Sequence, residues 1–95
     1  MSILIIGGDK IESISKSFME LGASKLKHIN GRRNSDSFYP FPQNIDVVVV
    51  LTKFLNHNLM YKYRDRAKEL GIPLIFANNK SEIHTQWNAK FKNNY

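Results

Sequence analysis

The segment DVVVVL (46–51) restricts the possible folds of this chain more than any other feature. Its apolar residues run without interruption from Val47 to Leu51, so a strand built from them is polar on neither face. A strand that borders solvent alternates apolar and polar residues, whereas the strands of a parallel sheet are covered on both faces. The segment therefore predicts an inner strand of a parallel sheet.

Three other apolar segments predict further strands: SILII (2–6), SKLKHI (24–29) and PLIFA (73–77). SKLKHI is half polar, which is typical of a strand at the edge of a sheet. Apolar residues spaced by three and four positions predict three helices. These residues are Ile11, Ile14, Phe18 and Leu21 in the first helix, Leu59, Tyr63, Ala67 and Leu70 in the second, and Ile83, Trp87 and Phe91 in the third.

Polar residues and glycines predict where the helices begin and end. A capping pair satisfies free N–H groups at a helix start, and a glycine often follows a helix end. The predicted capping pairs are Asp9 with Glu12 and Asn79 with Glu82, and the predicted stops are Gly22 and Gly71.

The alternation of strands and helices predicts an α/β fold. Because crossovers between parallel strands are right-handed, the simplest arrangement is a four-stranded parallel sheet in the order 2-1-3-4, flanked by helices. A chain of 95 residues has room for one domain, so we expect residues 1–95 to form a single Rossmann-like α/β domain.

One connection, residues 30–45, lacks a helical pattern because its prolines exclude a regular helix. A loop of this length in a small domain is usually functional. Its rings are expected either to cover one face of the sheet or to pack against a second copy of the chain, which predicts a homodimer. The rings are Phe38, Tyr39 and Phe41.

Polar residues gather where the predicted strands end. In an open parallel sheet, ligands bind beyond the carboxyl ends of the strands, at the point where the strand order reverses. We call this edge of the sheet the rim. The predicted ligand-binding residues at the rim are Gly7, Gly8, Asp9, Lys10, His28, Gly31, Thr52, Asn56 and His57.

Several rim residues also have structural interpretations, which the sequence leaves open. Gly7 and Gly8 form either a tight strand-to-helix turn or a backbone cradle for phosphate at a helix N-terminus. Asn56 is expected to cap the second helix, with His57 exposed on the first turn. Two histidines without cysteine or a carboxylate pair make a poor metal site, so no metal ion is expected.

Cations and aromatic rings form a second group of candidates. Cations that follow a phosphate backbone and rings that stack on bases are what single-stranded nucleic-acid binding needs. In the alternative interpretation, the rings cover the core and the charges are solvated, as the mixed charges of residues 62–69 also suggest. The predicted nucleic-acid-binding residues are Arg32, Arg33, Phe38, Tyr39, Phe41, Lys53 and Lys80.

The net charge of +6 favours a phosphate-rich partner, with nucleic acid first and single strands preferred. The alternatives are a pocket for a small anionic ligand or nucleotide, with or without catalysis by His28 or His57, and a homo-oligomeric accessory protein. No set of nucleophile, base and orienting residue is recognisable, so an enzyme is not the first expectation, and the sequence identifies no cofactor.

The composition also bears on location. No apolar run reaches the about 18–20 residues of a membrane span, and no basic segment precedes the short apolar stretch at the N-terminus. The absence of cysteine fits a reducing compartment. A cytoplasmic protein without a membrane partner is therefore expected.

Four segments, in this order, resemble the bacterial domain-of-unknown-function family 2325: ILIIGGD, HINGRRNSD, DVVVVLTKFLNHNL and AKELGIPLIFAN. The resemblance covers about residues 2–85 and implies the same fold. It also implies a site that includes Gly7, Gly8, His28, Gly31 and His57.

The chain departs from longer relatives after the third predicted strand. Those relatives carry cysteines and an aspartate there, whereas this chain has Thr52, Lys53 and Asn56. The resemblance therefore implies no thiol-dependent redox, metal or haem role here.

Overall fold

The strands form at the four apolar segments. The structure is a computed structural model that describes residues 1–8, 11–29, 41–52 and 57–91. Every neighbouring pair of strands is parallel and the order is β2-β1-β3-β4, which confirms the predicted sheet. The strands are β1 (Ser2–Ile6), β2 (Lys25–Ile29), β3 (Val47–Leu51) and β4 (Leu74–Ala77).

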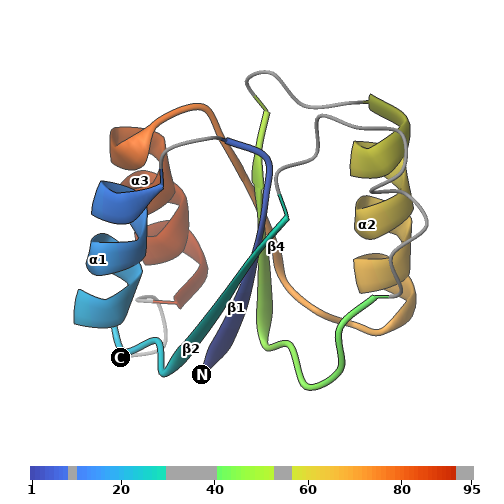
Figure 1. Ribbon diagram of the computed structural model, residues 1–95, viewed down its shortest axis with the longest axis horizontal. Helices are drawn as coiled ribbons and strands as arrows, with labels where there is room; N and C mark the ends of the chain where they lie inside the picture. The colour runs from blue at the N-terminus through green and yellow to red at the C-terminus, as the bar shows by residue number, and fades with distance from the viewer. Residues whose placement is uncertain (9–10, 30–40, 53–56, 92–95) are drawn as a thin grey trace.

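Helices cover both faces of this sheet. Those in the described residues are α1 (Glu12–Glu20), α2 (His57–Glu69) and α3 (Lys80–Phe91). α1 and α3 lie on one face and α2 lies on the other (Figure 1). None of these helices is long and apolar enough to cross a lipid bilayer.

The core consists of two clusters, one on each face of the sheet, and β3 contributes to both. Val47, Val49 and Leu51 pack beneath α1 and α3, whereas Val48 and Val50 pack beneath α2. All five side chains are buried, as the uninterrupted apolar run predicts. Burying one such side chain contributes roughly 1.5–3 kcal/mol, so this inner strand stabilises both layers of the fold.

β2 lies at one edge of the sheet, as its half-polar sequence predicts. Lys25 and Lys27 are exposed, Leu26 and His28 are half-buried, and Ile29 is buried. Charged side chains on an edge strand hinder pairing with the edge of another sheet.

The glycines end their helices as predicted. Gly22 has a φ of 105° and Gly71 a φ of 70°, conformations that L side chains rarely adopt. The next N–H group turns back to the helix in each case, from Ala23 to the Phe18 carbonyl (3.0 Å) and from Ile72 to the Ala67 carbonyl (2.9 Å). This is the Schellman pattern of a helix C-terminus.

One residue of the predicted apolar stripe of α2 does not reach the core. Leu59, Tyr63 and Ala67 are buried, but Leu70 is 50% exposed. The helix ends at Glu69, so Leu70 lies beyond the last turn and no longer follows the buried face. In α3, Ile83 and Trp87 are buried as predicted, and the side chain of Phe91 lies outside the described part of the structure.

Of the two predicted capping pairs, that of α3 is confirmed. The Glu82 N–H donates to Asn79 Oδ1 (2.9 Å), and Glu82 Oε2 accepts from the N–H of Asn78 (2.7 Å). The predicted start of α1 is wrong, because the N-cap is Ile11 and no side chain caps it. Asp9 itself lies outside the described residues.

We expect Asn79→Ala to lower the free energy of unfolding by about 1 kcal/mol, because it removes the side-chain acceptor at the start of α3. In a domain of this size, that corresponds to a fall in Tm of about 4–8 °C. Thermal unfolding followed by circular dichroism measures it. Gln86→Ala, at an exposed position inside α3, is the matched control. An equal fall in both variants would contradict a capping role for Asn79.

Candidate ligand-binding rim

The parallel sheet brings the carboxyl ends of all four strands to one edge, the upper edge in Figure 1. The described part of the predicted rim therefore comes from different elements. Gly7 and Gly8 follow β1, Thr52 follows β3, and His57 begins α2. Lys80 begins α3, the helix after β4.

Gly7 and Gly8 are required by the packing of the turn itself. Their φ angles are 95° and 79°. A Cβ on Gly7 would lie 2.5 Å from the carbonyl oxygen of Leu51, and a Cβ on Gly8 would lie 2.9 Å from Leu51 Cδ1. The Gly7 N–H also donates to the carbonyl of Ile29 (2.7 Å). These contacts provide a structural reason for both glycines, which is the tight-turn interpretation.

His28 is bonded to the same turn. Its Nε2 lies 2.8 Å from the carbonyl oxygen of Gly7 and 3.0 Å from that of Gly8. Both partners are acceptors, so Nε2 carries a proton and donates it. In neutral His28, Nε2 is therefore not available as a base or as a metal ligand. The histidine reaches the rim as predicted, but it holds the strand-to-helix turn in place.

Thr52 is bonded to the segment that follows β4. Its N–H donates to the carbonyl of Ala77 (3.0 Å), and its Oγ1 donates to Oδ1 of Asn78. The next residue, Asn79, accepts from the N–H of Glu82 at the start of α3. A chain of hydrogen bonds thus connects the ends of β3 and β4 with the first turn of α3.

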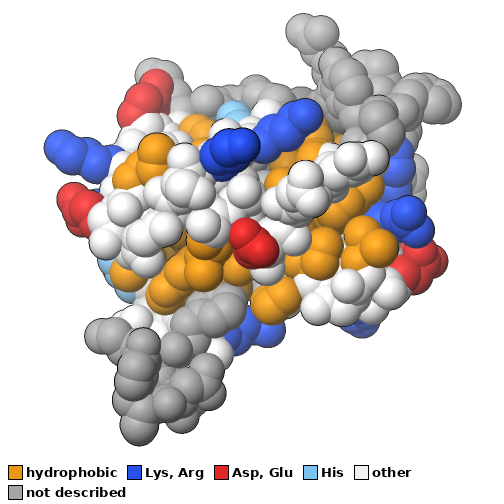
Figure 2. Space-filling model, turned by 90° about the horizontal axis from the view of Figure 1, so that it is seen from below, with side chains coloured by type: hydrophobic (Ala, Val, Ile, Leu, Met, Phe, Trp, Pro, Cys, Tyr) orange, Lys and Arg blue, Asp and Glu red, His pale blue; other side chains and the backbone are white. Residues whose placement is uncertain are grey.

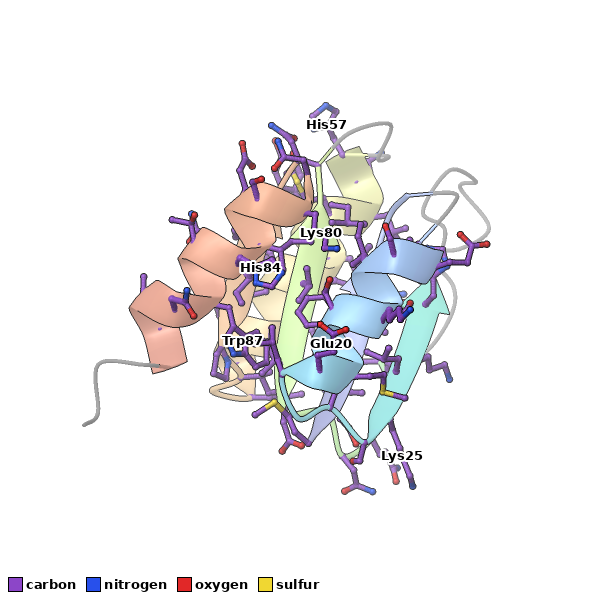
Figure 3. The ribbon with its side chains drawn as sticks, turned by 90° about the vertical axis from the view of Figure 1, so that its left-hand side faces the viewer. Glu20, Lys25, His57, Lys80, His84 and Trp87 are labelled. Atoms are coloured by element: carbon purple, nitrogen blue, oxygen red, sulfur yellow. The ribbon has the colours of Figure 1, made fainter. Side chains whose placement is uncertain are left out.

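His57 begins α2 and Lys80 begins α3, so these two side chains come from helices on opposite faces of the sheet. His57 is exposed at the start of α2, at the top of the view in Figure 3. Lys80 and His84 project from α3 on the side that faces α1 (Figure 3). Lys80 and His84 thus belong to the face of the sheet that α1 and α3 cover, whereas His57 belongs to α2 on the other face.

Phe41 belongs to the core cover on the face of α2. It is half-buried, packs against the cluster beneath α2, and its ring centroid lies 5.8 Å from that of Tyr63. Of the two interpretations of this ring, the structure thus favours core cover. Part of this ring is thus used to cover the core.

The remaining predicted site residues lie outside the described part of the structure, so their roles stay predictions. They are Asp9, Lys10, Gly31, Arg32, Arg33, Phe38, Tyr39, Lys53 and Asn56.

Sequence reasoning missed two clefts near the amino ends of the strands, each with a volume of about 520 Å³. The first lies between the edge strand, with Lys25 and Lys27, and the segment 42–45. The second lies between that segment and the end of α2. Figure 2 shows this end of the molecule, where Lys and Arg side chains border separate hydrophobic patches. The alternating lysines of β2 were the only signal of the first cleft in the sequence.

Among the described residues, no group of three or more histidine, aspartate or glutamate side chains is placed to hold a metal ion. The described rim is an edge built from backbone turns. Hydroxyl and amide groups lie at its centre, and His57 and Lys80 lie at its flanks. Such an edge can bind an anionic group, and it presents no recognisable arrangement for bond cleavage.

Comparison with known proteins identifies a family. A family model described as an uncharacterized protein conserved in bacteria (DUF2325) matches residues 2–85. No curated protein and no solved structure matches the chain. The match extends from the first strand through the first turn of α3, which includes every element that forms the rim. The chain therefore belongs to the DUF2325 family.

Proposed function

We propose that this protein binds a phosphate-rich partner without catalysis, with nucleic acid as the first candidate and single strands preferred. The observation that carries the proposal is the net charge of +6 on a surface of accessible cations. The exposed cations among the described residues are Lys16, Lys25, Lys27, Arg66, Lys68, Lys80 and Lys90. Such a surface attracts polyanions, and the attraction does not depend on sequence.

The bonding of His28 gives this side chain a structural role at the rim. Its Nε2 donates to two backbone carbonyls, so in the neutral ring Nδ1 carries the free lone pair that a general base needs. His57 is exposed on the first turn of α2, and an exposed imidazole with water around it is a weak catalyst but a good surface contact for phosphate.

The proposed preference for single strands rests on the aromatic side chains of the connection formed by residues 30–45. Aromatic rings stack on bases that are not paired, whereas paired bases in a duplex are inaccessible to them. Phe41 is occupied by packing against Tyr63, so this part of the proposal depends on Phe38 and Tyr39.

The test is a binding panel of single-stranded DNA, duplex DNA, single-stranded RNA and mononucleotides, measured by fluorescence anisotropy at several salt concentrations. We expect affinity to rise with strand length and to fall with salt. The slope of log affinity against log salt should be about −0.7 per phosphate contact on single strands and about −0.9 on duplex DNA. Saturable mononucleotide binding that strand length does not change would overturn the proposal in favour of a small-ligand pocket.

At residue level, we expect Arg32→Ala with Arg33→Ala to weaken binding to every sequence tested. The loss of two phosphate contacts should flatten the salt slope by about 1.4 on single strands. Tyr39→Ala should weaken binding to single strands more than to duplex DNA. Unchanged binding by the double arginine variant would show that residues 30–45 are not part of the proposed interface.

A second candidate, a small anionic ligand, is favoured by the cleft beside β2. Its volume of about 520 Å³ falls within the usual range for small-molecule sites, and Lys25 and Lys27 contribute positive charge to its wall. The mononucleotide arm of the panel tests this candidate, because ligand binding there would be saturable and would be lost in a Lys25→Gln, Lys27→Gln variant.

We also propose that the protein forms a homodimer and that the edge strand β4 takes part in the contact. β4 lies at the other edge of the sheet, and its Phe76 is 38% exposed. An edge strand with an exposed ring is a favourable surface for pairing with a second copy. We expect light scattering to give twice the mass of one chain, and Phe76→Glu to give the mass of one chain. A wild-type protein that stays monomeric at high concentration would refute the dimer.

A further inference from the structure

The outer surface of α2 carries a continuous row of cationic and aromatic side chains, which the mixed charges of this helix conceal in the sequence. His57, Tyr61, Arg64 and Lys68 are spaced by four, three and four residues, so they lie on one face of the helix. We call them the α2 stripe. At 1.5 Å per residue the stripe is about 16 Å long.

The stripe faces solvent. His57 and Lys68 are exposed, Tyr61 is 45% exposed, and the Arg64 side chain is 36% exposed. The face of α2 that packs on the sheet carries Leu59, Tyr63 and Ala67 instead. The core therefore does not explain the position of the Tyr61 ring.

The Tyr61 ring has a cationic or titratable group on each side along the helix. The Arg64 guanidinium lies 4.8 Å from the ring centroid, within the range of a cation–π contact. The His57 ring centroid lies 6.3 Å away on the other side. Arg64 is also oriented by Asp65, whose Oδ1 accepts from its Nε at 3.0 Å. The ring and the guanidinium are thus held side by side at the surface.

Charge distinguishes this helix from the opposite face of the molecule. α2 contains four Lys or Arg residues and two Asp or Glu residues, whereas α1 and α3, on the opposite face, together contain three lysines and three glutamates. A phosphate backbone is attracted to the side with the cationic excess. The exposed ring beside Arg64 adds a surface for stacking, which an acidic protein partner does not need but an unpaired base does.

We propose that the α2 stripe is a binding surface for single-stranded nucleic acid, with Tyr61 stacking on a base and Arg64 and Lys68 contacting phosphates. This inference rests on the proposed function and locates it on described residues. The stripe begins at His57 on the rim, so one strand contacts the rim and continues along α2. At about 3.4 Å per stacked nucleotide, the stripe accommodates roughly five nucleotides.

The test compares variants of the full chain in anisotropy titrations with a single-stranded oligonucleotide and a duplex of the same sequence. Tyr61→Ala should weaken binding to the single strand about fivefold to 100-fold, with a smaller effect on duplex, whereas Tyr61→Phe should keep wild-type affinity. Arg64→Gln with Lys68→Gln should flatten the salt slope on the single strand by about 1.4.

The matched control is Lys16→Gln, which removes an exposed cation on α1, on the opposite face of the sheet. It should change the salt slope by less than the about 0.7 expected for one phosphate contact. All substituted side chains are at the surface, so circular dichroism should give wild-type spectra and Tm values. Wild-type affinity in both Tyr61→Ala and the double variant, with the wild-type protein binding, would overturn the stripe and leave the proposed function standing. No polynucleotide binding by the wild-type protein would overturn both.

Discussion

Gly7→Ala should destabilise this protein more than any other glycine substitution in the described residues. The added Cβ would lie 2.5 Å from the backbone oxygen of Leu51, which no side-chain rotation relieves. Alanine must also adopt a φ of 95°, and such backbone strain alone costs about 1–3 kcal/mol. Clash and strain together should remove several kcal/mol from a total that is about 5–15 kcal/mol for a domain. Urea unfolding measures the difference.

Gly22→Ala is the matched control for this experiment. Gly22 has a φ of 105°, so alanine there is strained to a similar degree, but nothing lies within 4 Å of the added Cβ. We expect this variant to lose only about 1–3 kcal/mol. An equal loss of unfolding free energy at both positions would show that backbone strain explains the whole effect at Gly7. The close approach of Gly7 to Leu51 would then not contribute to stability.

Phe18→Ala should cost about 3–5 kcal/mol, the usual range for removing a fully buried phenylalanine. Phe18 is completely buried between α1 and α3, and its ring centroid lies 5.5 Å from that of Trp87. Since Trp87 is the single tryptophan of the chain, its fluorescence reports on this contact directly. We expect a lower urea midpoint and an altered emission spectrum in the folded state.

Phe18→Leu is the control, because it keeps an apolar side chain at the site and should cost less than half as much. If Phe18→Ala and Phe18→Leu unfold at the same urea concentration, the packing of α1 against α3 contributes little to stability. That outcome would contradict the core described here.

The candidate site was predicted from the sequence only in its position. The rule that ligands bind beyond the carboxyl ends of parallel strands located the rim once the strand order was predicted. The roles of its residues were less predictable. His28 was predicted to lie at the rim, but the sequence did not show that its Nε2 donates to the Gly7 and Gly8 carbonyls. Phe41 was a candidate for base stacking, but it packs against Tyr63.

The proposed α2 stripe was not recognisable in the sequence. Residues 62–69 mix positive and negative charges, and the sequence interpretation of this segment was a solvated face. In the helix, Arg64 lies beside the Tyr61 ring and pairs with Asp65 at 3.0 Å, and Arg66 pairs with Glu69 at 2.8 Å. The difference arises because a helix sorts neighbouring residues onto different faces.

The sequence by itself determined the strands, their order and the ends of the first two helices. The strands and helix ends depend on local signals: the uninterrupted run from Val47 to Leu51, the spacing of apolar residues in the helices, and the glycines at positions 22 and 71. The strand order follows from these elements and the right-handed crossover rule. Only the tertiary structure decided what the rim residues do. The bonds of His28 and the approach of Gly7 to Leu51 join residues at least 20 positions apart. The distance between such residues cannot be inferred from a local sequence pattern, because this distance is set by the packing of the whole sheet.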